Sequence, residues 1–205
     1  MNSFKIFQIE KNNEDIRKTV LTNLIKMLTE RKLLQSENFD ENIKNILNVV
    51  PDDLTYKIKL DSEKQETIIV RIIPQKITSI SKQSNINEFL NAFYDSHKIV
   101  IVKGISTKAH QYIINNYNRT EIFLEEFLMI NLIDHQFVPR YELIDHETDD
   151  FKKFCQIYQC KKRNIHKLLI NDPVTKYYNL KKGDIVRIIR PSETTGYSAS
   201  YRLVV

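Results

Sequence analysis

Adjacent carboxylates are the first residues in this sequence that suggest chemistry. Asp149 and Asp150 stand next to each other, and carboxylate oxygens are ligands that divalent cations accept. The pair falls at the start of a predicted helix, however, where acidic side chains stabilise the helix dipole without any metal. We therefore interpret these two residues as part of a helix start and not as a metal site.

Pro51-Asp52 suggests a second kind of chemistry, the metal-dependent hydrolysis of nucleic acid. A nuclease of this kind follows Pro-Asp with an acidic residue that stands two positions before a lysine on the next strand. The next predicted strand, residues 68–73, contains no carboxylate that could hold a cation. After this strand, an acidic residue two positions before a lysine occurs only in Asp150-Phe151-Lys152, which belongs to a different predicted module. The sequence therefore disfavours a nuclease.

The cysteines and histidines do not form a metal-binding pattern. Cys155 and Cys160 are the 2 cysteines, and the 5 histidines are scattered, whereas a zinc site needs four ligands at suitable spacing. Cys155 falls on the apolar face of a predicted helix, which favours a place in the core. With only 3 glycines in the chain, a glycine-rich phosphate loop is disfavoured as well. We expect no catalytic residue, no metal, no cofactor and no small-molecule substrate.

Length and charge narrow the classes of protein that fit. The chain has 205 residues, of which 41% are hydrophobic, enough for one large domain or two small ones. The net charge of +5 is mild: it permits salt-dependent contact with a phosphate backbone, but is low for a dedicated DNA-binding domain. A membrane span needs about 20 apolar residues, and the apolar runs here are short. We expect no membrane contact.

The elements of the first module, residues 1–132, follow from hydrophobic periodicity. Helical spacing predicts helices over residues 13–34, 39–50, 86–93 and 108–116. Alternating or continuous apolar runs predict strands over 56–60, 67–73, 98–103, 122–127 and 128–133, with Pro74 ending the second strand and a turn over 104–107. Strands that alternate with helices predict an α/β domain with a mixed sheet.

The second module, residues 133–205, is predicted to be a small α+β domain. Asp145 is predicted to cap a helix whose apolar face includes Phe151, Phe154 and Tyr158. Asp172-Pro173 marks a second helix start, with a cap residue before proline at the first helical position. A turn over 182–184, a strand over 185–189, a loop over 191–196 and a strand over 197–204 complete a predicted hairpin.

One ordered series of motifs in this module resembles a known family. The series is Asp172-Pro173-Val174, Tyr177-Tyr178, the stretches 180–186 and 188–194, Gly196, and Tyr201-Arg202-Leu203-Val204. It resembles the subunit five family of eukaryotic-type RNA polymerases, which also has an archaeal counterpart. Residues 135–139 resemble the junction that opens the assembly domain of that family, and residues 104–109 resemble a loop of its N-terminal jaw domain. The divergent jaw and the Asn/Ile/Lys-rich composition suggest a homologue from a large cytoplasmic DNA virus of the African swine fever virus type.

The resemblance implies a non-catalytic structural subunit of a multisubunit DNA-dependent RNA polymerase, acting in transcription. The assembly domain, residues 133–205, would dock on the largest polymerase subunit near the small sixth subunit. The jaw-like domain, residues 1–132, would lie beside downstream duplex DNA. A viral homologue would be found in the host cytoplasm and the virion, and a cellular one in the nucleus.

The resemblance also supplies candidate site residues. The candidates for the subunit interface are Asp172, Pro173, Tyr177, Arg190, Pro191, Ser192, Glu193, Tyr201 and Arg202. The candidates for a position near DNA are Ser106, Thr107 and Lys108, although Thr107 replaces a proline that is usual in the family. The alternative that remains open is a free-standing nucleic-acid-binding module with the same fold.

Overall fold

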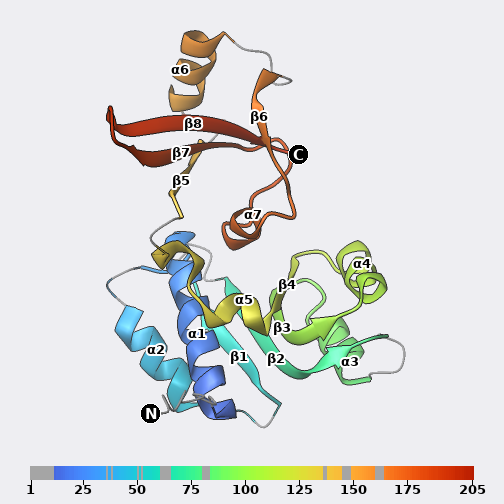
Figure 1. Cartoon of the computed structure of the whole chain (residues 1–205). Helices are drawn as coiled ribbons and strands as arrows, with labels where there is room; N and C mark the ends of the chain where they lie inside the picture. Colours follow the sequence, from blue (N-terminus) through green and yellow to red (C-terminus); the bar gives the residue numbers. More distant parts are fainter. Residues whose placement is uncertain are drawn as a thin grey trace, which may run out of the picture. The chain divides into compact units, whose positions relative to one another are not determined.

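The computed structural model describes residues 12–35, 37, 39–49, 51, 53–60, 66–79, 84–135, 138–144, 149–159 and 164–205 (Figure 1). The chain forms two compact units, Met1–Ile130 and Asn131–Val205. Both contain helices and strands, which agrees with the predicted mixture. The predicted cap Asp145, Asp52 and Cys160 lie outside the described residues, as do the side chains of Asp149, Asp150 and Cys155. Across the described part of the chain, no helix has the length and apolar character needed to cross a membrane.

The first unit is built on a four-stranded sheet. Its strands are β1 (Thr55–Lys59), β2 (Thr67–Ile77), β3 (His97–Ile105) and β4 (Thr120–Leu124), in the spatial order β1-β2-β3-β4. β1 pairs with β2 antiparallel, whereas β2, β3 and β4 are parallel. The predicted mixed sheet is therefore confirmed. Both inner strands are apolar on both faces, as expected for a sheet that is covered on both sides.

Helices cover the two faces of this sheet. They are α1 (Asn13–Glu30), α2 (Phe39–Asn48), α3 (Ser84–Ala92), α4 (Thr107–Asn116) and α5 (Glu125–Met129). The helices α3 and α4 pack on one face through a core that includes Leu90, Val100 and Ile113. On the other face, Ile99 and Ile101 are fully buried, and α1 and α5 lie together there (Figure 1). The Asn23 side-chain amide ties α1 to α5 by donating to the Leu128 carbonyl at 2.8 Å.

Three predicted features of the first unit are wrong. The strand predicted to stop at Pro74 continues to Ile77. Its register with β3 shifts between Ile73 and Lys76, and an irregularity of this kind accommodates a residue that has no N–H. Gly104 belongs to β3 and not to a turn. A Cβ there would lie 3.2 Å from the Lys76 Cγ, which is a reason for glycine at that position. Strands were predicted over 122–127 and 128–133, but β4 ends at Leu124, residues 125–129 form helix α5 and residues 132–134 form a 3₁₀ helix. A short apolar run fits either element.

The second unit contains a four-stranded sheet of its own. The strands β5 (Arg140–Ile144), β6 (His166–Leu168), β7 (Ile185–Ser192) and β8 (Gly196–Val204) have the order β5-β7-β8-β6. The helix α6 (Asp149–Tyr158) covers one face through Phe154. Leu180 and Tyr178, which follow the helix α7 (Pro173–Tyr177), pack on the other face with Val186. The short 3₁₀ helix η2 (Leu132–Asp134) precedes β5.

The antiparallel β7–β8 hairpin is longer than predicted. β7 runs through Pro191 to Ser192, and only residues 193–195 form the turn where a loop over 191–196 was predicted. The nitrogen of Pro191 points to the side of β7 that faces β5. The pairing of β5 with β7 reaches only as far as Ile189, opposite Arg140, so the missing N–H of Pro191 removes no bond of this ladder. Gly196 begins β8 with a φ of +73°, a conformation that favours glycine.

Candidate subunit interface

Two features of the described residues bear on the candidate site: the side chains that could hold a metal and the positions of the predicted site residues. Within the described ranges, no group of three or more His, Cys, Asp and Glu side chains could hold a metal ion. The predicted site residues are instead distributed over helix α7 and the β7–β8 hairpin of the second unit, and over the start of helix α4 in the first.

Asp172, Pro173 and Tyr177 build helix α7. The Asp172 Oδ1 accepts a hydrogen bond from the Val174 N–H at 2.9 Å, and Pro173 follows at the first helical position, so the predicted cap is confirmed. Tyr177 is only 2% exposed, and its hydroxyl lies 3.1 Å from the Asn131 Oδ1. The ring of Tyr177 is therefore buried, unlike the candidate residues on the hairpin.

The outer part of the β7–β8 hairpin presents two different faces. Because side chains alternate along a strand, the cross-strand pairs Ile189–Ala199 and Pro191–Tyr197 share one face. This apolar hairpin face consists of Ile189, Pro191, Tyr197 and Ala199. Tyr197 is 73% exposed, and Pro191 and Ala199 are exposed as well. Such an uncovered apolar strip is a feature of contact surfaces.

The opposite, polar hairpin face carries Arg190, Ser192, Ser198, Ser200 and Arg202 by the same alternation. Burial raises the pKa of Tyr141 on the adjacent strand β5, and Asp172 raises it further. Arg190 and Arg202 act in the opposite direction on the same hydroxyl. Three of the predicted residues, Asp172, Arg190 and Arg202, are therefore within electrostatic range of the Tyr141 hydroxyl.

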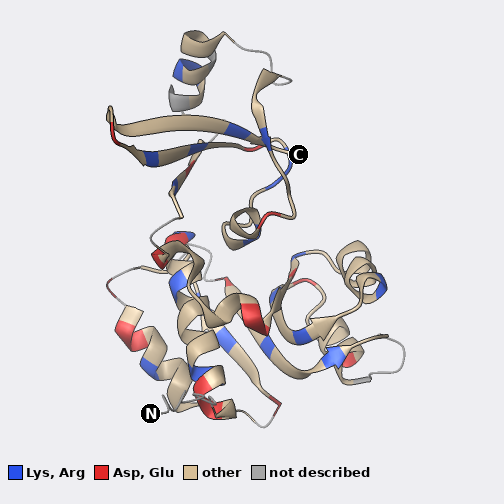
Figure 2. Cartoon of the chain, viewed as in Figure 1, with Lys and Arg blue, Asp and Glu red and all other residues tan. Residues whose placement is uncertain are grey.

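The tip and base of the hairpin complete the candidate surface. Glu193 is exposed in the turn, and the Ser192 Oγ lies 3.3 Å from the Thr194 Oγ1. Figure 2 shows basic segments along both strands and an acidic segment at the tip. At the base, the ring of Tyr201 packs against those of Phe154 and Tyr158, with centroids 4.8 and 5.0 Å apart. Tyr201 thus joins the exposed hairpin to the core under α6.

The candidates near DNA lie at the start of helix α4. The Ser106 hydroxyl accepts from the Ala109 N–H at 3.2 Å and donates to the Thr78 carbonyl at 2.9 Å. Ser106 is therefore engaged as the helix cap. Thr107 and Lys108 are exposed on the first turn, where they are accessible to a phosphate backbone.

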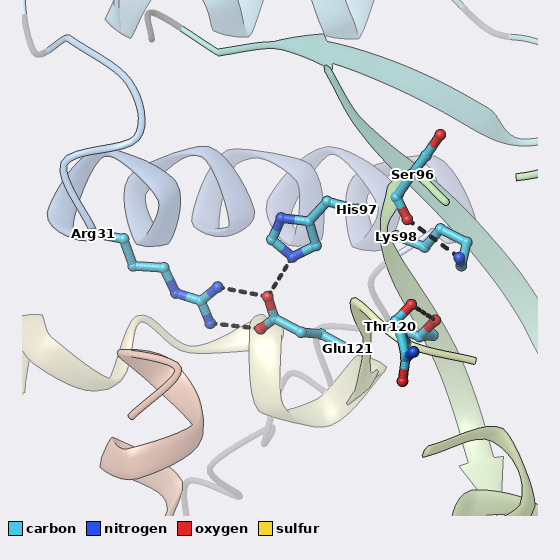
Figure 3. A network of polar contacts seen from close by, with 7 residues as sticks. Arg31, Ser96, His97, Lys98, Thr120 and Glu121 are labelled. Atoms are coloured by element: carbon cyan, nitrogen blue, oxygen red, sulfur yellow. Dashed lines mark hydrogen bonds and ion pairs between the residues drawn. The ribbon is translucent and has the colours of Figure 1, made fainter. Parts of the chain in front are cut away.

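A polar network inside the first unit escaped the sequence prediction. The guanidinium of Arg31 lies 2.9 and 3.0 Å from the two carboxylate oxygens of Glu121, and the His97 Nε2 lies 2.7 Å from one of them. Figure 3 shows both side chains pointing at this carboxylate, Arg31 from the end of α1 and His97 from β3. Burial by itself would raise the pKa of Glu121, but the His97 hydrogen bond and Arg31 lower it.

The neighbouring Lys98 is also buried, with 0% exposure. Its amine donates to the carbonyls of Phe93, Tyr94 and Ser96 at 2.7–3.2 Å, at the end of helix α3. Burial lowers the pKa of this lysine. The Glu121 and Lys98 networks each connect elements of the first unit. We therefore propose that they stabilise its fold and do not form part of the contact surface.

Comparisons with known proteins agree on one family. The family model described as the RNA polymerase Rpb5 C-terminal domain matches residues 130–204. DNA-directed RNA polymerase subunit 5 of Acanthamoeba polyphaga mimivirus is 34% identical over 205 residues, covering 98% of this chain and 97% of the relative. The DNA-directed RNA polymerases I, II, and III subunit rpabc1 of Dictyostelium discoideum is 30% identical over 197 residues, covering 93% and 95%. The corresponding subunit of Caenorhabditis elegans is 36% identical over 109 residues, about half of each chain.

Proposed function

The chain belongs to the subunit 5 family of DNA-directed RNA polymerases, and on this basis we propose that it is a structural, non-catalytic subunit of such an enzyme. Its second unit acts as the assembly domain, which docks on the largest polymerase subunit near the small sixth subunit. Its first unit acts as the jaw-like domain. The observation that carries the proposal is the β7–β8 hairpin, whose outer half contributes little to the core of its own unit.

Several physical properties of the hairpin support docking. Residues 196–200 of β8 are all exposed, although the antiparallel pairing with β7 holds their backbone in a defined geometry. A pre-ordered surface loses little conformational entropy when it binds. Tyrosine and arginine are also the residue types that most often dominate the energy of an interface. Tyr197 supplies the aromatic group, and Arg190 and Arg202 supply the cations.

The chemistry of transcription would then belong to the other polymerase subunits. The mimivirus relative supports a viral source. For a viral subunit, we propose the host cytoplasm and the virion as its locations. For the first unit we propose a place near downstream duplex DNA, with Thr107 and Lys108 exposed at the start of α4 as the nearest groups.

Replacement of residues 190–193 by alanine tests the docking proposal. This segment, Arg190-Pro191-Ser192-Glu193, lies outside the described hydrophobic clusters, so the full chain should remain folded. Loss of a few dominant contacts costs at least about 2 kcal/mol, which corresponds to roughly thirtyfold weaker binding. We expect the variant to lose co-purification with the co-expressed largest subunit.

The matched control for this experiment replaces Lys181 and Lys182 by alanine. Both are exposed and lie in the turn at the opposite end of the hairpin, so they change charge without touching the outer half. This control should co-purify like the unmodified chain. A 190–193 variant that is retained as well as the control would contradict docking through the hairpin.

The DNA proposal is tested by the affinity of the isolated chain for duplex DNA at several salt concentrations. We expect weak binding at physiological salt, because a net charge of +5 supports few phosphate contacts. Lys108→Ala should lower the steepness of the salt dependence, since each phosphate contact contributes about 0.9 to that slope. Lys57→Ala on strand β1, also exposed, is the control. Submicromolar binding would instead favour the free-standing nucleic-acid-binding module.

A further inference from the structure

One edge of strand β8 is open in the second unit. β6 pairs with β8 only at Arg202, Leu203 and Val204, whereas β7 pairs with β8 from Leu203 back to Gly196 on the other side. Among the described residues, the stretch Gly196–Tyr201 therefore has a strand neighbour on one side only. A strand edge of this kind exposes a row of backbone N–H and C=O groups.

The hydrogen-bond pattern identifies the backbone groups that point to the open edge. Val204 bonds through its N–H and C=O to the Asp184 carbonyl and the Gly183 N–H, on the β7 side. Val205 bonds to Leu168 and Ile170, on the β6 side. Because the direction alternates along a strand in an antiparallel ladder, the N–H and C=O groups of Tyr197, Ala199 and Tyr201 point away from β7. They lie before the first β6–β8 pair, His166 with Arg202.

The open edge lacks the features by which proteins protect such strands. Proteins protect edges with lysine and other charges, with proline, or with a covering element. The edge strand β1 carries Lys57 and Lys59, and the edge strand β5 carries Arg140 and Glu142. By contrast, the stretch Gly196–Tyr201 reads Gly-Tyr-Ser-Ala-Ser-Tyr, without a charge or a proline. An unprotected edge in a folded protein is a site at which another strand can pair.

The side chains that flank the edge define the chemistry of the incoming strand. On one side of the sheet lie Tyr197, Ala199 and Tyr201, which are apolar or aromatic. On the other side lie Ser198, Ser200 and Arg202, with Arg190 beside Ser198 on β7. An added strand also alternates its side chains between these two sides. The complementary segment is therefore extended, with apolar residues alternating with acidic ones.

We propose that this edge is completed by strand addition: an extended segment of the largest polymerase subunit, with alternating apolar and acidic residues, pairs with β8 along Tyr197–Tyr201. The inference rests on the proposed docking function and specifies its geometry. Main-chain hydrogen bonds give such a contact its affinity, and the alternating side chains give it specificity. A second copy of this chain fits less well, because its own β8 would bring a further arginine and no acidic residue to the polar side.

Proline at position 199 tests the role of the edge directly. Ala199→Pro removes an N–H that points to the open edge and leaves the bonds between β7 and β8 intact, whereas Ala199→Ser keeps that N–H. We expect Ala199→Pro to bind the co-expressed largest subunit at least tenfold more weakly, and Ala199→Ser to bind like the unmodified chain. Tyr197→Pro applies the same test nearer the tip, should the first variant lose its fold.

Backbone amide exchange in the complex provides the second measurement. The amides of Tyr197 and Ala199 should become protected when the largest subunit binds, while those of Ser198 and Ser200 are already protected by β7. Unchanged binding of the largest subunit by folded Ala199→Pro or Tyr197→Pro would overturn strand addition. The proposal would also be overturned if the isolated chain formed a dimer through the β8 edge and the proline variant dissociated that dimer. Failure of the unmodified chain to bind at all would instead overturn the docking function itself.

Discussion

The carboxylate of Glu121 illustrates how a single residue connects distant parts of the first unit. Its partners are Arg31, which follows helix α1, and His97, which begins strand β3. The side chains of Arg31 and Glu121 are only 4% and 14% exposed. At this burial, the removal of one partner leaves the other charge without compensation, which is more costly than the loss of a surface ion pair.

Glu121→Gln should therefore destabilise the first unit by about 3 kcal/mol, because the buried Arg31 guanidinium loses its counter-charge. Urea denaturation of the full chain, followed by circular dichroism, measures this change. Glu126→Gln on helix α5 is the control, since Glu126 is exposed and its loss should cost less than about 1 kcal/mol. Equal effects of the two substitutions would show that the network contributes little.

The same carboxylate makes stability depend on pH in a defined direction. The pKa of Glu121 is lowered from its ordinary value of 4.5 in the folded chain. Its stabilising contribution is therefore complete above about pH 4.5 and is lost as the pH falls through the folded pKa. The unmodified chain should lose more stability than Glu121→Gln over this acidic range.

Among the elements, helix α7 depends on its first residues. Asp172 caps it, and removal of a cap costs about 1 kcal/mol. Asp172→Ala should lower the unfolding free energy of the second unit by this amount, whereas Asp172→Asn should preserve it because asparagine also caps well. Asp172 was predicted as an interface residue, so the same pair of variants separates its roles. If Asp172→Asn remains stable but loses the largest subunit, the charge itself contacts the partner.

The sequence predicted the order of helices and strands in the first unit as far as β4, but it missed helix α5 and several boundaries. The regular apolar spacing of residues 13–30 predicted helix α1 well, since a long periodic pattern leaves few alternatives. The pattern failed where tertiary pairing decides the outcome. Pro74 and Pro191 both lie within strands, because each occupies a position at which no ladder bond requires its N–H.

The candidate site shows a similar limit at the level of side chains. The sequence predicted the hairpin and the α7 cap, because turn and cap residues act locally. It did not predict that Tyr177 is buried or that the edge of β8 is open. Both properties depend on which distant segments lie beside these residues, since β6 begins its pairing with β8 only at His166, opposite Arg202.

At the scale of the whole chain, we propose a different role for each of the two compact units. The unit Asn131–Val205 coincides closely with the region that matches the Rpb5 C-terminal family model, residues 130–204. The similarity to the mimivirus relative extends over nearly the full length. We therefore propose a polymerase subunit in which the assembly unit docks and the other unit is available to nucleic acid.

Affinity purification of the tagged, full-length chain from the cells in which it is naturally expressed tests this proposal most directly. Mass spectrometry of the co-purifying proteins should find the largest RNA polymerase subunit in near-equal amount, together with further polymerase subunits. The association should survive nuclease treatment, because protein contacts through the hairpin carry it. Recovery of the folded chain alone, or with nucleic acid but without polymerase subunits, would contradict the proposal.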